Sequence, residues 1–265
     1  MRFGSGYQGS SFSELLRIDY AHLVVDFTDL SRSSAALPSV PQGTTVLVTK
    51  YADGVLVAGD RLATEGSRVA SRDIDKVFPA DDHSLIAISG AAGPCIEMAR
   101  IMRVELEHYE KIEGEPLELE GKANKLSGMI RANLPAAMQG LVVIPLFAGY
   151  DPRRKTGRLW KFDVTGGRYE EADFEATGSG SLYARESLKK SHSLTATRDE
   201  ALKVALQALM DAADEDRATG GVDTRRGIYP IFIFCSAQGI ERVPDEEVAR
   251  VHREVEDAGG QGASS

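Results

Sequence analysis

A pair of adjacent threonines, Thr44-Thr45, marks the point at which the character of this 265-residue chain changes. Gly43 and a stretch with two prolines precede the pair, and an apolar run at 46–48 begins directly after it. An Asp-Gly pair at 53–54 then leads into a second apolar run at 55–58, which is the pattern of a β-hairpin. The folded part of the chain is therefore expected to open with a strand whose first residues are threonines.

The chemistry of Thr44 would change if the bond to Gly43 were cut. Its freed α-amino group would lie beside its own hydroxyl and could act as the general base that a weak alcohol nucleophile requires. A threonine at the start of a strand is otherwise common, because β-branched residues favour strands. Two charged residues, Asp60 and Lys76, closely follow apolar runs, where a buried charge has to be paired. Taken singly, each could also be a solvated surface charge.

Four motifs occur in a fixed order along the chain: TTVLVTKYADGVLVAGDR, RDIDKV, GSGS and DEDRATGG. In this order and spacing the chain resembles the β subunit of the actinobacterial proteasome over residues 44–244. That family belongs to the N-terminal-nucleophile hydrolases. The resemblance implies an α+β fold, a four-layer αββα sandwich of two sheets with helices outside. Periodicity alone predicts only the order strands, two helices, strands, two helices.

The resemblance also implies roles for Thr44, for the charged pair Asp60 and Lys76, and for a glycine. Thr44 matches the nucleophile, and Lys76 matches the lysine whose positive charge favours the deprotonated hydroxyl. Asp60 matches the acid that pairs with this lysine. Gly90 matches the glycine whose backbone N–H helps to form the oxyanion hole.

Three further residues match the polar network around the new amino terminus. Ser179 and Asp216 fit the family pattern directly. Thr219 stands where the family usually has a serine, so the hydroxyl is kept and a methyl group is added.

The residues matched to substrate side-chain recognition are small or apolar: Ala63, Ile74, Ile88 and Ala92, with Cys95 and Ile96 near the rim. No acidic residue belongs to this set, and Lys76 lies at its base. An apolar residue on the acyl side of the cut bond is therefore expected to be preferred, followed by an acidic one, with a basic one last.

The sequence predicts three regions. Residues 1–43 are rich in serine and glycine and have the pattern of a linker or disordered tail, and the resemblance implies a propeptide removed by autocleavage at Gly43–Thr44. Residues 44–244 form the hydrolase domain, and 245–265 a C-terminal helix with a disordered tail from 259. Strands are expected at 46–51, 55–59, 85–89, 142–150, 157–163, 168–177, 228–236 and 240–243, and helices at 94–111, 116–134, 181–191, 199–214 and 245–255.

Composition excludes several classes of function. A net charge of −9 argues against a nucleic-acid partner. The two cysteines lie in apolar contexts without metal-ligand spacing, which favours buried free thiols in a reducing cytoplasm over a disulfide, a metal site or another cofactor. No apolar run reaches the roughly 18 residues of a membrane span, and no secretory signal is present.

The resemblance implies a homo-heptameric β ring, an α-subunit ring, a ring-shaped ATPase and unfolded or modifier-tagged protein substrates. One alternative is the simpler bacterial two-ring threonine protease, which usually has almost no leader. Another is a non-catalytic scaffold subunit, which would lack the threonine or the lysine, whereas this chain has both.

Overall fold

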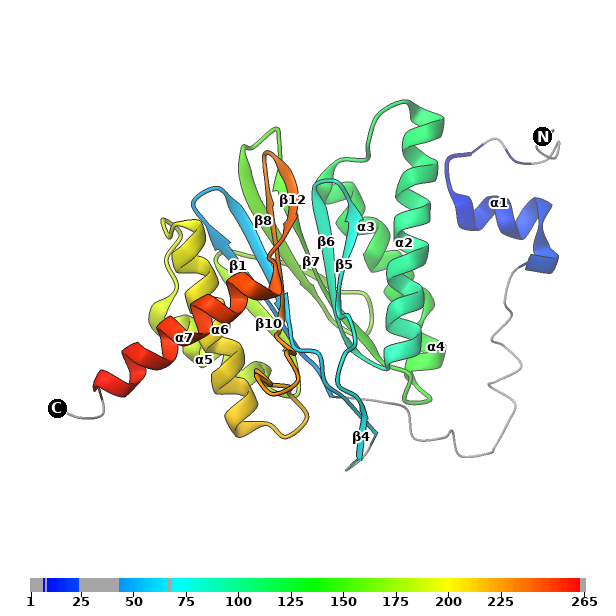
Figure 1. The fold of residues 1–265 in the computed structure, drawn as a ribbon. Coiled ribbons are helices and arrows are strands. Elements are labelled where there is room, and N and C mark those ends of the chain that lie inside the picture. Colours follow the sequence, from blue (N-terminus) through cyan, green and yellow to red (C-terminus); the bar gives the residue numbers. More distant parts are fainter. Residues whose placement is uncertain (1–6, 8, 24–42, 66–67, 263–265) are drawn as a thin grey trace.

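Two five-stranded antiparallel sheets face each other in the computed structural model, which describes residues 7, 9–23, 43–65 and 68–262 (Figure 1). The first, the β1 sheet, has the order β10-β1-β2-β11-β12, and the second, the β6 sheet, has the order β5-β6-β7-β8-β9. The β1 sheet comprises β1 (Thr45–Tyr51), β2 (Gly54–Gly59), β10 (Phe174–Gly178), β11 (Ile231–Ser236) and β12 (Gly239–Arg242). The β6 sheet comprises β5 (Val77–Asp81), β6 (Ser84–Gly90), β7 (Val143–Asp151), β8 (Thr156–Phe162) and β9 (Arg168–Glu171).

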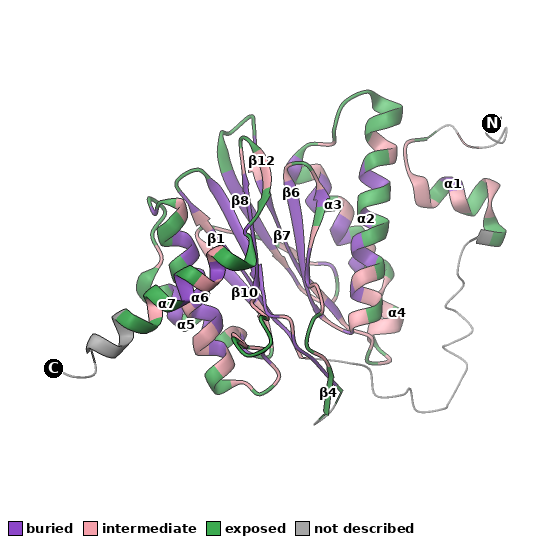
Figure 2. Cartoon of the chain, in the orientation of Figure 1, coloured by how far each residue is buried: buried purple, intermediate pink, exposed green. Residues whose placement is uncertain are grey.

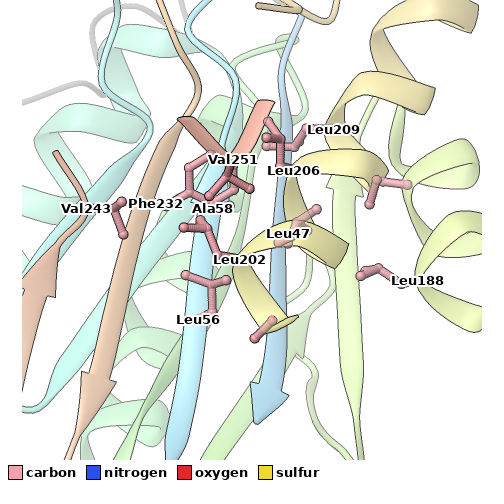
Figure 3. Close-up of a cluster of buried hydrophobic side chains, with 14 of the residues drawn as sticks. Leu47, Leu56, Ala58, Leu188, Leu202, Leu206, Leu209, Phe232, Val243 and Val251 are labelled. Atoms are coloured by element: carbon pink, nitrogen blue, oxygen red, sulfur yellow. The ribbon is translucent and has the colours of Figure 1, made fainter. Parts of the chain in front are cut away.

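Helices cover the outer face of each sheet. On the β1 sheet lie α5 (Ser181–Ser191), α6 (Arg198–Glu215) and α7 (Asp245–Gly262), whose apolar residues form one cluster with the strands (Figure 3). On the β6 sheet lie α2 (Ala92–Glu113) and α3 (Leu119–Ala132), followed by the short α4 (Leu134–Ala137). The expected four-layer αββα arrangement is therefore confirmed.

Strand β1 shows why the sheets stack in this way. Successive side chains of a strand point to opposite faces, so an apolar run can serve two cores at once. Leu47 belongs to the cluster beneath the helices, whereas Val46 and Val48 belong to the cluster between the sheets. All three are fully buried, and the buried residues follow the central strands in Figure 2.

The predicted strand at 168–177 is wrong, because the chain changes sheet within it. Strand β9 ends at Glu171 in the β6 sheet, and β10 begins at Phe174 in the β1 sheet. No glycine or proline interrupts residues 168–177, so the sequence pattern does not reveal the crossing. The crossing carries β10 to the side of β1, where Thr45 pairs with Gly178.

Several other boundaries differ from those expected. The helix predicted from Pro116 begins at Leu119, because Glu118 has an extended backbone (φ −58°, ψ 149°), and it ends at Ala132, so Leu134 falls in α4. The predicted tail is helical up to Gly262, where α7 ends, and 263–265 lie outside the described residues. Short strands β3 (Ala63–Glu65), β4 (Arg68–Ser71) and β5 were not predicted.

The leader region is also more structured than a linker pattern indicates. Residues Phe12–Asp19 form helix α1, which packs against α2, and a 3₁₀ turn follows at Ala21–Leu23. The alternative of a disordered tail is therefore wrong for this segment, and the proline-containing part at 24–42 lies outside the described residues.

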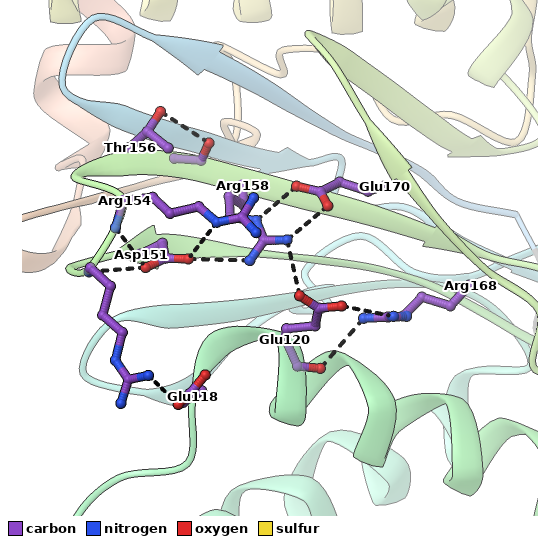
Figure 4. Close-up of polar contacts among 10 residues, drawn as sticks. Glu118, Glu120, Asp151, Arg154, Thr156, Arg158, Arg168 and Glu170 are labelled. Carbon is purple, nitrogen blue, oxygen red and sulfur yellow. Dashed lines mark hydrogen bonds and ion pairs between the residues drawn. The ribbon is translucent and has the colours of Figure 1, made fainter.

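A buried arginine ties α3 to the β6 sheet (Figure 4). The Arg158 guanidinium pairs with Glu170 on β9 at 2.7 Å, with Asp151 at the end of β7 at 3.2 Å, and with Glu120 on α3 at 3.4 Å. It also lies 4.6 Å from the centre of the Trp160 ring. Hydrogen bonding to Glu170 is the main reason why the pKa of Arg158 is raised. The charge is therefore fully paired, as a buried ion must be.

Both cysteines are buried and free, as expected. No helix in the described ranges combines the length and the apolar character needed to cross a bilayer.

Candidate active site

Four segments converge at one end of the β1 sheet: the start of β1, the residues after β2, the residue before β5 and the loop after α6. Asp60, which has no exposed surface, lies at their centre. Its Oδ1 accepts from the backbone N–H of Thr45 at 2.7 Å, and its Oδ2 accepts from those of Leu62 at 2.9 Å and Gly220 at 2.8 Å. The carboxylate thus holds three of the four segments together.

Lys76 completes the environment of this carboxylate. Its Nζ donates to Asp60 Oδ1 at 2.6 Å and to the carbonyl oxygen of Leu62 at 2.5 Å. The side chain is 5% exposed, and burial lowers the pKa of Lys76 while the charge and hydrogen bond of Asp60 oppose that shift. Its third contact is the carbonyl oxygen of Gly43, at 3.2 Å.

Thr44 lies directly beside that same carbonyl group. Its Oγ1 donates to the Gly43 oxygen at 2.6 Å, and its own carbonyl oxygen accepts from the Ser179 N–H at 2.9 Å. The hydroxyl, the ammonium group of Lys76 and the Gly43–Thr44 peptide bond are therefore all within contact distance. Thr44 is 6% exposed, so little bulk water competes for these contacts.

Gly43 occupies a backbone conformation that suits glycine. Its φ is +119°, and a Cβ there would come within 2.4 Å of the Thr64 hydroxyl oxygen and 2.9 Å of the Ala218 Cβ. Other residues would be strained at this position whatever their chemistry. The peptide bond before Thr44 is thus fixed in a tight space.

A second polar network lies behind the threonines. Asp216 Oδ2 accepts from the hydroxyls of Ser179 at 2.5 Å and Thr219 at 2.6 Å. The Thr219 oxygen also lies 2.6 Å from the hydroxyl of Thr45. Burial acts to raise the pKa of Asp216, but the hydrogen bonds from Ser179, Thr219 and the Ala218 N–H outweigh it and lower the pKa. Thr219 is buried with its hydroxyl paired, so the extra methyl group is accommodated.

A pocket opens in front of Thr44. All four predicted recognition residues line it, and Gly90 lies in its wall with φ +120°. Its lining comprises Gly43, Thr44, Ala63, Ile74, Asp75, Lys76, Phe78, Ile88, Gly90, Ala92, Cys95 and Ile96. The residues are mostly apolar, and Phe78 and Asp75 were missed by the sequence reasoning.

Asp75 corrects the expectation that the pocket contains no acidic residue. It lies between Ile74 and Lys76, both already assigned to the site, and this adjacency was the available signal. Its side chain is 45% exposed and stands 3.7 Å from Arg61 and 3.8 Å from Arg242. The lining therefore holds one acidic and one basic residue, Asp75 and Lys76, and the predicted rank of acidic above basic substrate residues stays a prediction.

Cys95 is the other nucleophilic side chain in the lining. Burial raises the pKa of Cys95 to about 12, so the thiol is neutral at physiological pH and is a poor nucleophile. Within the described parts of the chain, no group of three or more histidine, cysteine or acidic residues could hold a metal ion. Thr44 differs from Cys95 in that its hydroxyl and the ammonium group of Lys76 contact the same carbonyl oxygen, that of Gly43.

Comparison with known proteins agrees with the resemblance found in the sequence motifs. The family described as "Proteasome subunit" matches residues 40–224. A "Proteasome subunit beta" of Streptomyces griseus is 52% identical over 215 residues, covering 81% of this chain and 76% of that protein. Proteins of the same description from Acidimicrobium ferrooxidans (49% identical over 250 residues, 94% of this chain and 90% of that protein) and Acidothermus cellulolyticus (52% over 223 residues, 82% and 77%) also match. The resemblance found in the four motifs is thus confirmed, and the chain belongs to the proteasome subunit family, among its β subunits.

Proposed function

We propose that this chain is a self-processing threonine endopeptidase that acts as the β subunit of a proteasome core particle. The observation that carries the proposal is the convergence of the Thr44 hydroxyl and the Lys76 ammonium group on the carbonyl of Gly43. The proposed nucleophile, the positive charge and the target bond thus lie together in one chain, which supports the proposal.

The first step is removal of residues 1–43. Thr44 Oγ1 attacks the carbonyl carbon of Gly43, and the negative charge that develops on the carbonyl oxygen is stabilised by Lys76 Nζ, 3.2 Å away. The C–N bond breaks, and the proton lost by the hydroxyl ends on the amine of Thr44. Water then hydrolyses the ester, which releases the leader with a free carboxylate.

The second activity uses the amino group that this step creates. The α-amine of Thr44 accepts the hydroxyl proton as Oγ1 attacks a substrate peptide carbonyl, and the proton passes to the leaving amine. Water hydrolyses the resulting acyl-enzyme with the same amine as base. Lys76 stabilises the deprotonated hydroxyl, Asp60 keeps Lys76 charged, and the Gly90 N–H is the proposed oxyanion donor. Ser179, Asp216 and Thr219 hold the new amino terminus in position.

The pocket supports preference for an apolar residue on the acyl side of the cleaved bond. Ala63 and Ala92 leave room, and Ile74, Ile88 and Phe78 supply apolar walls. Burial alone favours a bulky apolar side chain over a small one by roughly 1–3 kcal/mol. Asp75 adds a negative charge that opposes the repulsion of a basic side chain by Lys76, but Arg61 and Arg242 already lie 3.7 and 3.8 Å from its carboxylate. Cleavage after basic residues is therefore expected at a lower but measurable rate.

Assembly into rings is the third part of the proposal. The expected partners are six further copies in a heptameric β ring, an α-subunit ring and a ring-shaped ATPase, in the cytoplasm, with unfolded or modifier-tagged proteins as substrates. Large apolar residues exposed on the helices support subunit contacts: Ile101, Val104 and Ile112 on α2, and Leu182 and Tyr183 on α5. Light scattering on β co-expressed with an α subunit should show a particle of many chains, and a fully active monomer would contradict this.

The test of self-processing is Thr44→Ala, with Thr49→Ala as a matched control. Both residues are buried threonines, Thr44 directly before β1 and Thr49 within it, but only Thr44 lines the pocket. Intact mass should show that the parent and the control begin at Thr44, whereas Thr44→Ala keeps residues 1–43 and cleaves no fluorogenic peptide. Loss of the leader from Thr44→Ala in a protease-free preparation would overturn the proposal.

A further inference from the structure

The leader helix α1 is held against α2 by a specific polar contact. Glu105 of α2 is 2% exposed, and its two carboxylate oxygens face the first turn of α1. Oε2 accepts from the Phe12 N–H at 3.1 Å, and Oε1 accepts from the Ser13 N–H at 2.6 Å. The Ser13 hydroxyl donates to Oε1 as well.

These donors are the groups that a helix leaves unpaired at its start. The first N–H groups of an α-helix have no partner within the helix and carry partial positive charge, so a carboxylate is a matched partner. Ser11 caps the helix by accepting from the Glu14 N–H at 3.4 Å. Glu105 thus binds the end of α1 as an anion, from outside the helix.

Apolar and ionic contacts surround this carboxylate. Leu15 of α1 is 7% exposed, and the ring of Phe12 lies 5.8 Å from that of His108 on α2. On the other side Lys125 of α3 pairs with Glu105 Oε2 at 2.8 Å, which balances the charge. Without α1, the carboxylate would keep Lys125 but lose its three donors from the leader.

Chain connectivity does not force α1 into this position. The pocket at Thr44 is lined by Ala92, and Glu105 lies about 20 Å further along α2 at 1.5 Å per residue. Residues 24–42 connect the 3₁₀ turn at Ala21–Leu23 to Gly43, and a chain of this length could span up to about 65 Å if it were extended. The leader could therefore lie in many other places, so the contact with Glu105 reflects recognition.

We propose that the side of α2 around Glu105 is a binding site for α1, which keeps the leader on the subunit after the chain between them has been cut. Its ligand class is the N-terminus of an amphipathic helix that presents free N–H groups, a hydroxyl and an apolar residue one turn on. Retention after natural cleavage rests on the proposed self-processing, whereas the site itself does not.

The test uses the full chain carrying Thr44→Ala, with a recognition sequence for a site-specific protease placed within residues 24–42. After cutting, the leader fragment should co-elute with the rest of the chain in size-exclusion chromatography at micromolar concentration. Before cutting, hydrogen exchange should show protected N–H groups at Phe12 and Ser13. Neither readout depends on the chemistry of Thr44, so failure of self-processing leaves the test intact.

Matched variants distinguish specific binding at Glu105 from non-specific association of the leader. Glu105→Gln removes the charge and should lower the protection of those two N–H groups, and the affinity for the leader fragment, at least tenfold. Glu107→Gln, on the same helix but 49% exposed and paired with Arg103, should change neither. Leu15→Ser should also release the leader, and it lies outside the two-sheet core.

Free elution of the leader from the parent chain, or unprotected N–H groups at Phe12 and Ser13, would overturn the proposal. Co-elution that survives Glu105→Gln and Leu15→Ser unchanged would overturn it too, because other contacts would then hold the leader.

Discussion

Replacing Lys76 by methionine tests the proposed mechanism most directly. Methionine fills much of the same volume and removes only the ammonium group. The variant is expected to lose peptidase activity and leader removal while the chain stays folded.

The size of the loss in rate can be worked from the contacts. A unit charge 3.2 Å from the oxygen that becomes negative contributes about 5 kcal/mol at an effective dielectric constant near 20. Water entering the vacated space recovers part of this. Removing a single donor to a developing oxyanion costs about 3–4 kcal/mol in other enzymes, so a rate loss on the order of 10³-fold is expected.

The stability cost is smaller than for most broken ion pairs. Asp60 would lose its charged partner, and removal of one member of a buried pair typically costs about 3–5 kcal/mol. However, the N–H groups of Thr45, Leu62 and Gly220 still donate to the carboxylate. We therefore expect the free energy of unfolding to fall by about 3 kcal/mol, near the lower end of that range.

The assay compares Lys76→Met with Lys122→Met. Lys122 is equally buried, at 6% exposed, and pairs with Asp81, but it lies outside the pocket. Urea unfolding of the isolated chains should give similar losses of stability for the two variants. In particles assembled with the α subunit, kcat/KM for a fluorogenic peptide should fall about 10³-fold only for Lys76→Met. Near-parental turnover by a folded, assembled Lys76→Met particle would refute the reasoning.

Four further outcomes are expected. Gly43→Ala should slow leader removal, followed by intact mass, because φ is +119° there and a methyl group would meet an oxygen at 2.4 Å; parental kinetics would contradict this. Thr219→Val should lower peptidase activity about tenfold while Thr219→Ser keeps it, since the side-chain hydroxyl is the group of Thr219 that bonds the Asp216 carboxylate; equal activity of the two variants would show that this hydroxyl is not needed. The lowered pKa of Asp216 means that its ionised form stabilises the fold above its usual pKa, and this contribution is lost as pH falls through the lowered value. Ser179→Ala removes a hydrogen bond to that carboxylate, so the acid midpoint of unfolding should move to higher pH, and an unmoved midpoint would count against the network. Asp75→Asn should reduce cleavage after basic residues relative to apolar ones, and an unchanged ratio would remove Asp75 from recognition.

Most strands and helices could be predicted from periodicity, but their stacking could not. Apolar runs such as 55–58 identify buried strands without saying which sheet they join. The crossing between Glu171 and Phe174 illustrates the limit, because nothing in the local pattern distinguishes a long strand from two strands in different sheets. The arrangement of layers came from the resemblance, which carries long-range information that a single run lacks.

The site could be anticipated where a side chain supplies the chemistry. Thr44, Asp60 and Lys76 were assigned from motifs, and the structure brings them within hydrogen-bond distance of one another or of Gly43. The backbone donors at Leu62 and Gly220 could not be anticipated, because any residue has an N–H group and only the fold directs it. Helix α1 escaped detection for a related reason: its partner, Glu105, is over 90 positions away.

The position of β1 within its sheet determines how mobile a new N-terminus at Thr44 would be after cleavage. Chain ends usually fray, because they have neighbours on one side at most. Here β1 lies between β10 and β2, and the carbonyl oxygens of Thr44 and Thr45 accept from Ser179 at 2.9 Å and from Asp60 at 3.0 Å. A chain end created at Thr44 would therefore be held in place by hydrogen bonds to both neighbouring segments. The amine and hydroxyl of Thr44 would then lose little conformational freedom when substrate binds. The entropy cost of positioning them arises once, during folding, and not in each catalytic cycle.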